Sequence, residues 1–111
     1  YYWADKLGYL TWGEAPSWGL DANSPVAARN FMSEWRNIVV RDMNHPSLVT
    51  WTPFNEEFWP DETQYPRFVS DIYDMTKQLS IVRVIVLWEK GNFFCLADIM
   101  THRGSQKQIP F

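Results

Sequence analysis

The spacing of apolar residues predicts two long amphipathic helices. Across residues 24–43 the apolar positions recur three and four apart, and the charged positions fall largely on the other side. This period is typical of a helix with one buried face. Ser24 followed by Pro25 matches an N-cap residue and a first helical position. Residues 65–79 repeat the pattern, and residues 1–7 resemble the last turns of an earlier helix.

Short apolar segments between these helices predict strands. The expected strands lie near residues 9–15, 47–54, 82–87 and 97–100, and residues 88–96 are expected to form a loop. The second segment is apolar on both faces except for two threonines. Half-exposed antiparallel strands alternate apolar and polar residues, whereas parallel strands covered on both faces do not. A parallel sheet is therefore expected.

The order of these elements, with strands and helices alternating, predicts the α/β class with right-handed crossovers. The connections that follow strands are longer than those that lead from a helix to a strand. In α/β folds the loops after the strands carry the functional site. There are too few strands to close an eight-stranded barrel, which takes about 250 residues. No GxGxxG or GxxxxGK phosphate loop follows any predicted strand.

Composition narrows the class of protein further. The 111 residues suit one domain, are 46% hydrophobic and carry a net charge of -3. The absence of a basic stripe argues against a nucleic-acid partner, and no apolar run approaches the ~18 residues of a membrane span. A single cysteine, Cys95, allows no internal disulfide and leaves the compartment open. Because the chain starts without Met or a signal peptide and ends without a stop signal, it is expected to be a piece of a longer protein.

The first candidate for chemistry is Glu56, which follows the apolar segment 47–54 and is framed by aromatic residues. Apolar walls and a second carboxylate raise the pKa of such a group, as a general acid at neutral pH requires. The alternative is a solvated loop carboxylate that caps the next helix. Glu57 is the weaker candidate, because neighbours in an extended segment point to opposite sides.

Other polar and aromatic residues also lie at the predicted strand ends. Asn55 and Glu14 could bind sugar hydroxyls, although a turn amide and an exposed loop acid are the plainer alternatives. Trp12 and Trp88, like Trp18 and Trp59, could stack on a flat apolar ligand or simply pack in the core.

The two histidines and the cysteine provide a further test for a site. His102 follows the last predicted strand and is a candidate for the same ligand site. His45, Cys95 and His102 do not have the spacing of a metal site. The sequence therefore predicts neither a metal nor a cofactor.

Three segments resemble the catalytic barrel of the family 2 glycoside hydrolases, which include β-galactosidases, β-glucuronidases and β-mannosidases. They read YYWADKLGYLTWGEAPSWG, EWRNIVVRDMNHPSLVTWTPFNEE and YDMTKQLSIVR. The specific part is RDMNHPSLVTWTPFNE, which matches the family's acid/base segment on the fourth barrel strand. The likeness extends over residues 1–83. Beyond Ser80 it is loose, because two prolines of the family's LDPTRPV segment are absent and only Asp98, Ile99 and His102 match a later segment.

The resemblance implies roles for individual residues. Glu56 corresponds to the family's acid/base, Asn55 to the residue that contacts the sugar 2-hydroxyl, and Glu14 to an acidic residue lining the sugar site. The family's nucleophile is a second Glu near the seventh strand, and we expect it to lie outside these residues. A fragment without it is expected to be inactive alone.

Residues 1–111 are thus interpreted as a fragment of a single glycoside hydrolase catalytic domain, a partial (β/α)8 TIM barrel comprising about strands 3 to 6. The parent enzyme would hydrolyse β-glycosides with retention, with a carbohydrate as its partner. The alternative is a non-catalytic carbohydrate-binding or structural α/β fragment. The sugar, the aglycone and the oligomeric state are left open.

Overall fold

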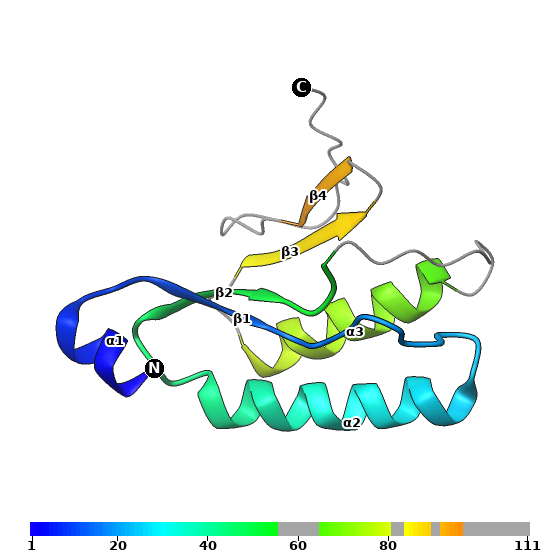
Figure 1. Ribbon diagram of the computed structural model, residues 1–111, viewed down its shortest axis with the longest axis horizontal. Helices are drawn as coiled ribbons and strands as arrows, with labels where there is room; N and C mark the ends of the chain where they lie inside the picture. Colours follow the sequence, from blue (N-terminus) through cyan, green and yellow to red (C-terminus); the bar gives the residue numbers. More distant parts are fainter. Residues whose placement is uncertain (56–64, 81–83, 90–91, 97–111) are drawn as a thin grey trace.

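The computed structural model describes residues 1–55, 65–80, 84–89 and 92–96, with side chains for 1–55 and 67–80. The elements are α1 (Tyr2–Leu7), β1 (Thr11–Glu14), α2 (Pro25–Asp42), β2 (Leu48–Thr52), α3 (Tyr65–Leu79), β3 (Val84–Glu89) and β4 (Asn92–Leu96). The strands form one sheet in the order β1-β2-β3-β4. Figure 1 shows α2 and α3 on the same side of β1 and β2, which fits the predicted right-handed crossovers. Consecutive strands are therefore neighbours, with the helices as a second layer.

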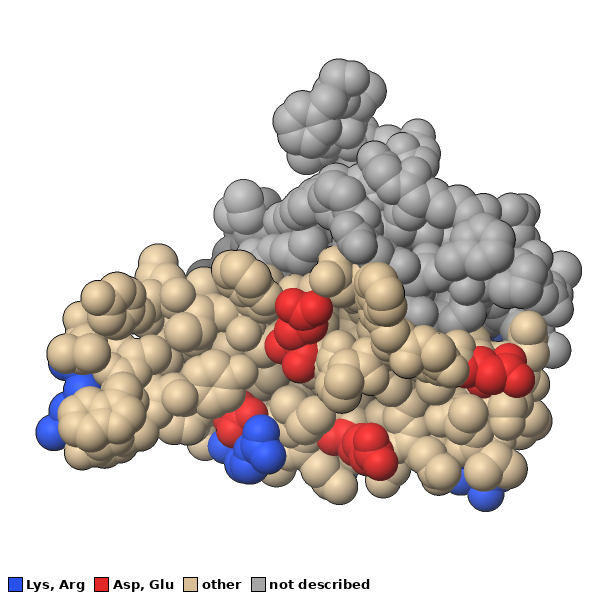
Figure 2. Space-filling model, viewed as in Figure 1, with Lys and Arg blue, Asp and Glu red and all other residues tan. Residues whose placement is uncertain are grey.

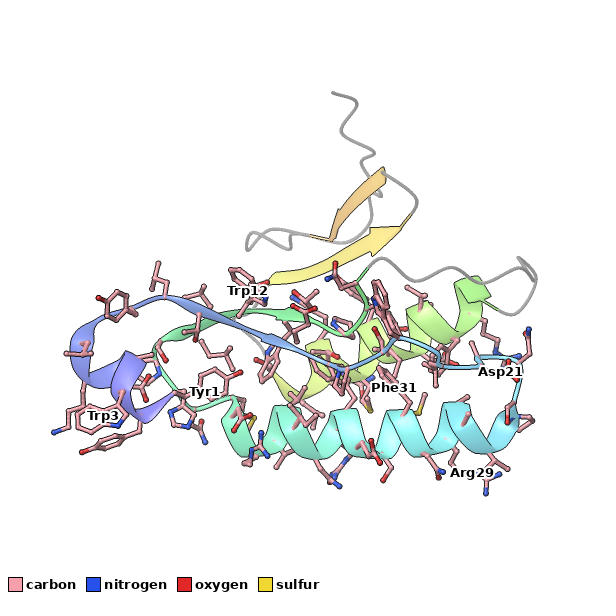
Figure 3. All side chains as sticks on the ribbon, in the orientation of Figure 1. Tyr1, Trp3, Trp12, Asp21, Arg29 and Phe31 are labelled. Atoms are coloured by element: carbon pink, nitrogen blue, oxygen red, sulfur yellow. The ribbon has the colours of Figure 1, made fainter. Side chains whose placement is uncertain are left out.

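Both long helices lie where the apolar spacing predicted them. Ser24 caps α2, because its Oγ accepts a hydrogen bond from the Ala27 N–H at 3.4 Å and Pro25 occupies the first turn. Figure 3 shows Phe31 projecting from α2 toward the sheet and Arg29 projecting away from it. The helix thus has one buried face and one solvent-exposed face, as the spacing of its apolar residues indicates.

The first three strands are parallel, as predicted. β1 pairs with β2 from Thr11↔Leu48 to Glu14↔Thr52, and β2 pairs with β3 through Thr50↔Val84 and Trp51↔Ile85. β1 and β2 are shorter than the predicted segments, because the ladder begins and ends inside them. Their carboxyl ends lie at the same edge of the sheet, which is where the candidate residues were expected.

The prediction of a loop over residues 88–96 is wrong. β3 extends to Glu89, and β4 follows and pairs with it antiparallel, with Glu89 opposite Asn92. Two residues separate the paired ends, and a connection of that length joins only antiparallel strands, since a parallel crossover takes a dozen or more residues. The strand predicted at residues 97–100 lies outside the described residues.

Two tryptophans form the centre of the core between the sheet and the helices. Trp35 of α2 and Trp51 of β2 are almost completely buried and meet edge to face, with ring centroids 5.6 Å apart. The Trp35 Nε1–H donates to Thr76 Oγ1 at 2.9 Å, and the Trp51 Nε1–H donates to Ser80 Oγ at 3.2 Å. Each buried indole N–H therefore has the partner that burial requires.

A second aromatic group lies toward the carboxyl end of β2. Phe54 stacks on Phe31 at 5.2 Å between ring centroids and contacts Phe68 of α3 at 5.7 Å. All three rings belong to the core or pack against it. Phe54 therefore anchors the chain immediately before Asn55.

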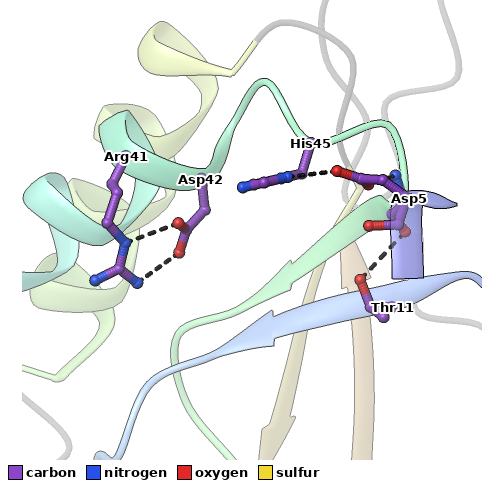
Figure 4. A network of polar contacts seen from close by, with 6 residues as sticks. Asp5, Thr11, Arg41, Asp42 and His45 are labelled. Atoms are coloured by element: carbon purple, nitrogen blue, oxygen red, sulfur yellow. Dashed lines mark hydrogen bonds and ion pairs between the residues drawn. The ribbon is translucent and has the colours of Figure 1, made fainter. Parts of the chain in front are cut away.

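The amino-terminal end of the sheet is held by a small polar network (Figure 4). The Ser47 N–H donates to Asp5 Oδ1 at 2.9 Å, and His45 Nδ1 lies 2.6 Å from Asp5 Oδ2. Hydrogen bonds from Ser47 and then from His45 lower the pKa of Asp5 to about 2. The Ser47 carbonyl in turn accepts the Thr11 N–H at 2.8 Å. We call Asp5, His45 and Ser47 the α1 clasp, because it fastens α1 to the start of β2.

The described part of the face in view carries no large patch of like-charged side chains (Figure 2). Figure 2 shows Asp and Glu side chains scattered over the described part of this face, with Lys and Arg in small separate groups on the side of the helices and at one end. Within the described residues, no helix combines the length and the apolar character needed to cross a membrane.

Candidate functional site

Trp12 and Glu14 project from the sheet face opposite the helices. They are two positions apart on β1 and exposed, while Gly13 between them is buried. Figure 3 shows Trp12 on the side of the sheet away from α2. In a parallel α/β barrel this face points inward, and Glu14 ends the strand at the carboxyl edge.

A register shift in β2 gives that face a polar character. Thr11 pairs with Leu48, but Trp12 pairs with Thr50, so Val49 is an extra residue in β2. The shift keeps both Leu48 and Trp51 fully buried. Thr50 and Thr52 therefore share the face of Trp12 and Glu14, which explains why this strand does not alternate along its whole length.

The Glu14 carboxylate is the centre of the site. Its Oε2 accepts a hydrogen bond from Trp12 Nε1 at 3.1 Å, and its Oε1 accepts one from Asn55 Nδ2 at 3.1 Å. Asn55 lies 41 positions further along the chain. With Nδ2 donating to Glu14, Asn55 can still accept a hydrogen bond through its Oδ1. Within the part of the chain that the structure describes, Glu14 forms no ion pair.

Trp18 adds a contact to the same group from the loop that follows β1. Its Nε1–H donates to the Asn55 backbone carbonyl at 2.8 Å, and 74% of its surface is exposed. Trp12 is likewise 62% exposed. Two exposed indole rings therefore lie beside a carboxylate and an amide. Flat apolar rings next to polar groups suit a sugar, which has apolar faces and hydroxyl groups.

The structure brings together three of the residues selected from the sequence: Glu14, Asn55 and Trp12. The expected acid/base residue Glu56 and the candidate His102 lie outside the described residues, and for Trp88 only the backbone, within β3, is described. The sequence also placed Trp18 at a strand exit. Its bond to the Asn55 carbonyl could not be predicted, because it depends on how two loops 37 positions apart meet.

The site contains no metal centre among the residues that can be placed. In the described ranges, no group of three or more His, Cys, Asp or Glu side chains lies close enough to hold an ion. The donors and acceptors at the site are a carboxylate, an amide, two threonine hydroxyls and two indoles. Such a set can hydrogen-bond and orient a polyhydroxylated ligand.

Comparison with known proteins places this chain in a family. The family described as "Glycosyl hydrolases family 2, TIM barrel domain" matches residues 5–107. A beta-galactosidase of Thermoanaerobacterium thermosulfurigenes is 34% identical over 115 aligned positions, which cover 95% of this chain and 15% of that protein.

A second relative supports the same assignment. A protein of Formosa agariphila that is named provisionally as a beta-glucuronidase is 27% identical over 82 positions. The alignment covers 68% of this chain and 10% of that protein. The chain thus spans less than one sixth of the length of either relative.

Proposed function

This chain belongs to the glycosyl hydrolases of family 2 through their TIM barrel domain, and we propose that it forms part of a retaining enzyme that hydrolyses β-glycosides. Both relatives carry names of enzymes that act on β-linked sugars. The single observation that carries the proposal is the hydrogen bond between Glu14 and Asn55 at the carboxyl ends of two parallel strands. In this class of barrel, side chains at that edge form the active site.

We place the chain at about strands 3 to 6 of the barrel. β1, β2 and β3 run parallel in consecutive order, which fits strands 3 to 5. The antiparallel β4 does not continue that repeat. The segment assigned to strand 6, residues 97–100, lies outside the described part of the chain.

The proposed mechanism assigns proton transfer to Glu56, which directly follows Asn55. In the first step Glu56 donates its proton to the glycosidic oxygen while a carboxylate from another segment attacks the anomeric carbon, and the aglycone leaves as an alcohol. In the second step Glu56 takes a proton from water, and the resulting hydroxide displaces the enzyme carboxylate from the sugar. A retaining scheme needs the two carboxyl groups about 5 Å apart.

The residues around Glu14 then bind the sugar. Each Glu14 oxygen already accepts one protein N–H, which leaves acceptor capacity on both for sugar hydroxyls. The Asn55 Oδ1 accepts from a further hydroxyl, as the family resemblance implies for the 2-hydroxyl. Trp12 offers its exposed ring to an apolar sugar face. In the full enzyme these residues bind the substrate together with Trp88 and His102.

The test compares Glu56→Gln with Glu57→Gln in the full enzyme, on an unactivated alkyl β-glycoside and on an aryl β-glycoside with an acidic phenol as leaving group. General acid catalysis contributes about 10²–10⁴-fold, so Glu56→Gln should lower kcat/KM by that factor on the alkyl substrate. On the activated substrate kcat/KM should change little, since the leaving group needs no proton. The value of kcat should still fall there, because the second step lacks its base.

The neighbouring carboxylate serves as the matched control. Glu57→Gln should alter kcat/KM by less than about 10-fold on both substrates. Azide, which attacks without being deprotonated, should raise kcat of Glu56→Gln on the activated substrate and yield a glycosyl azide. Equal and mild losses for the two variants on both substrates would remove Glu56 from the mechanism.

A further inference from the structure

A hydrogen bond from the loop after β1 reaches the backbone that immediately precedes Glu56. The Trp18 Nε1–H donates to the Asn55 carbonyl oxygen at 2.8 Å. That oxygen belongs to the peptide unit that joins Asn55 to Glu56. Because a peptide unit is planar, fixing its oxygen also fixes its N–H and the direction of the next Cα. Trp18 thus holds the Asn55 carbonyl, in the peptide unit that precedes Glu56.

Among the described residues, the backbone ladder of the sheet reaches this segment only as far as Thr52. The last bond in register with the sheet joins the Ala15 N–H to the Thr52 carbonyl at 3.1 Å. Pro53 has no N–H to offer, and Phe54 holds the chain through its ring. Asn55 is then held twice, through its side chain by Glu14 and through its carbonyl by Trp18.

The loop that carries Trp18 is itself well defined. The Leu20 N–H donates to the Ser17 carbonyl at 3.0 Å, and Gly19 has a φ of 82°, which closes a tight turn at Trp18 and Gly19. Ser17, the first residue of this turn, is buried, with 2% of its surface exposed. The indole is therefore presented from a fixed turn and not from a free loop tip, although its ring remains mostly exposed.

We propose that Trp18 is a positioning residue for the acid/base step, acting through the Asn55–Glu56 peptide. The inference rests on the proposed role of Glu56. In this proposal, loss of the indole N–H lets the Asn55–Glu56 peptide plane rotate, which makes proton donation by Glu56 less efficient. Because a misplacement of about 1 Å can cost about 10²-fold in rate, proton donation should suffer while sugar binding at Glu14 persists.

The test uses Trp18→Phe in the full enzyme, which keeps an aromatic ring and removes the N–H. Its kcat/KM on the alkyl β-glycoside should fall by about 10- to 100-fold, with little change on the activated aryl β-glycoside. Trp18→His keeps a ring N–H the same number of bonds from the backbone, and it should recover most of the loss. A role limited to packing the loop predicts that Phe, the larger ring, is the better replacement.

Two further variants separate this inference from the proposed function. Trp12→Phe removes the other indole donor of the site, which bonds Glu14 and not the backbone, and it should lower kcat/KM equally on both substrates. Equal losses for Trp18→Phe on both substrates, with Glu56→Gln still selective for the alkyl substrate, would overturn the positioning role alone. If Glu56→Gln shows no selectivity either, the proposed function fails and this inference fails with it.

Discussion

The six-membered ring of Trp51 lies where a side chain on Gly13 would have to stand. A Cβ at position 13 would be 2.6 Å from both Cε3 and Cζ3 of Trp51, its partner in the β1–β2 register. The Trp51 ring is fully buried and held by Trp35 and Ser80. Gly13 therefore allows the largest core side chain of β2 to lie against the backbone of β1, between the two site residues of that strand.

Gly13→Ala should destabilise the enzyme because the ring cannot move away. Overpacking of this kind costs about 1–3 kcal/mol of unfolding free energy, measurable by urea denaturation. The matched test is the double-mutant cycle with Trp51→Phe, whose smaller ring vacates the space. The cost of Gly13→Ala should shrink in that background, and strictly additive costs would contradict the steric explanation.

The α1 clasp should make stability depend on pH on the acid side. The pKa of Asp5 is lowered from 3.8 to about 2 in the folded chain, so the folded state favours the carboxylate. Its contribution is fully present above about pH 4 and is lost as the pH falls toward 2. The difference in Tm between the unsubstituted enzyme and Asp5→Asn should therefore be largest at pH 5 and shrink as the pH approaches 2.

A control carboxylate distinguishes the clasp from general acid unfolding. Asp71 is exposed on α3 and lies outside the clasp. Asp71→Asn should give a Tm difference that stays small over the same pH range. A Tm difference for Asp5→Asn that is independent of pH would show that the carboxylate charge contributes nothing to the clasp.

Glu14→Gln should weaken catalysis and lower stability only slightly, because both hydrogen bonds of Glu14 within the protein are exposed. The amide removes the charge and replaces one acceptor oxygen with a donor. In the proposed role Glu14 accepts sugar hydroxyls, and hydrogen bonds to a charged group contribute about 1.5–3 kcal/mol, which corresponds to about a 10- to 100-fold loss in kcat/KM. Steady-state kinetics and a thermal scan measure the two effects.

Asp74 provides the comparison for that substitution. It is an exposed carboxylate on α3, on the other layer of the fold. Asp74→Asn should leave kcat/KM within about 2-fold of the unsubstituted enzyme, because surface substitutions away from special features change little. A loss as large as that of Glu14→Gln would indicate a charge effect with no connection to the site.

The isolated 111-residue chain should not hydrolyse β-glycosides at an enzymatic rate. Under the proposed mechanism it provides the proton donor and not the nucleophile, and a general acid alone contributes about 10²–10⁴-fold. It should also aggregate, because β1 and β4 are the edge strands of the described sheet and several large apolar side chains are exposed. The measurements are product release and light scattering. Turnover that Glu56→Gln abolishes would place both carboxylates within these residues.

The sequence by itself determined the helices and the family of the chain. The bounds of α3 are those predicted, and α2 differs by one residue at each end, because apolar spacing and capping residues act within a few turns of one helix. The family was identifiable from RDMNHPSLVTWTPFNE, whose residues are contiguous. Glu14, Asn55 and Trp12 were selected because each follows or ends a strand of a predicted parallel sheet.

Only the tertiary structure decided which residues meet. The predicted loop over 88–96 is instead the end of β3 and all of β4, because a short apolar run becomes a strand only when another strand is free to pair with it. The register shift at Val49, the contact of Gly13 with Trp51 and the bond from Trp18 to Asn55 depend on residues more than 30 positions apart. Local sequence cannot specify these long-range contacts, because they are set by how the sheet and its loops pack.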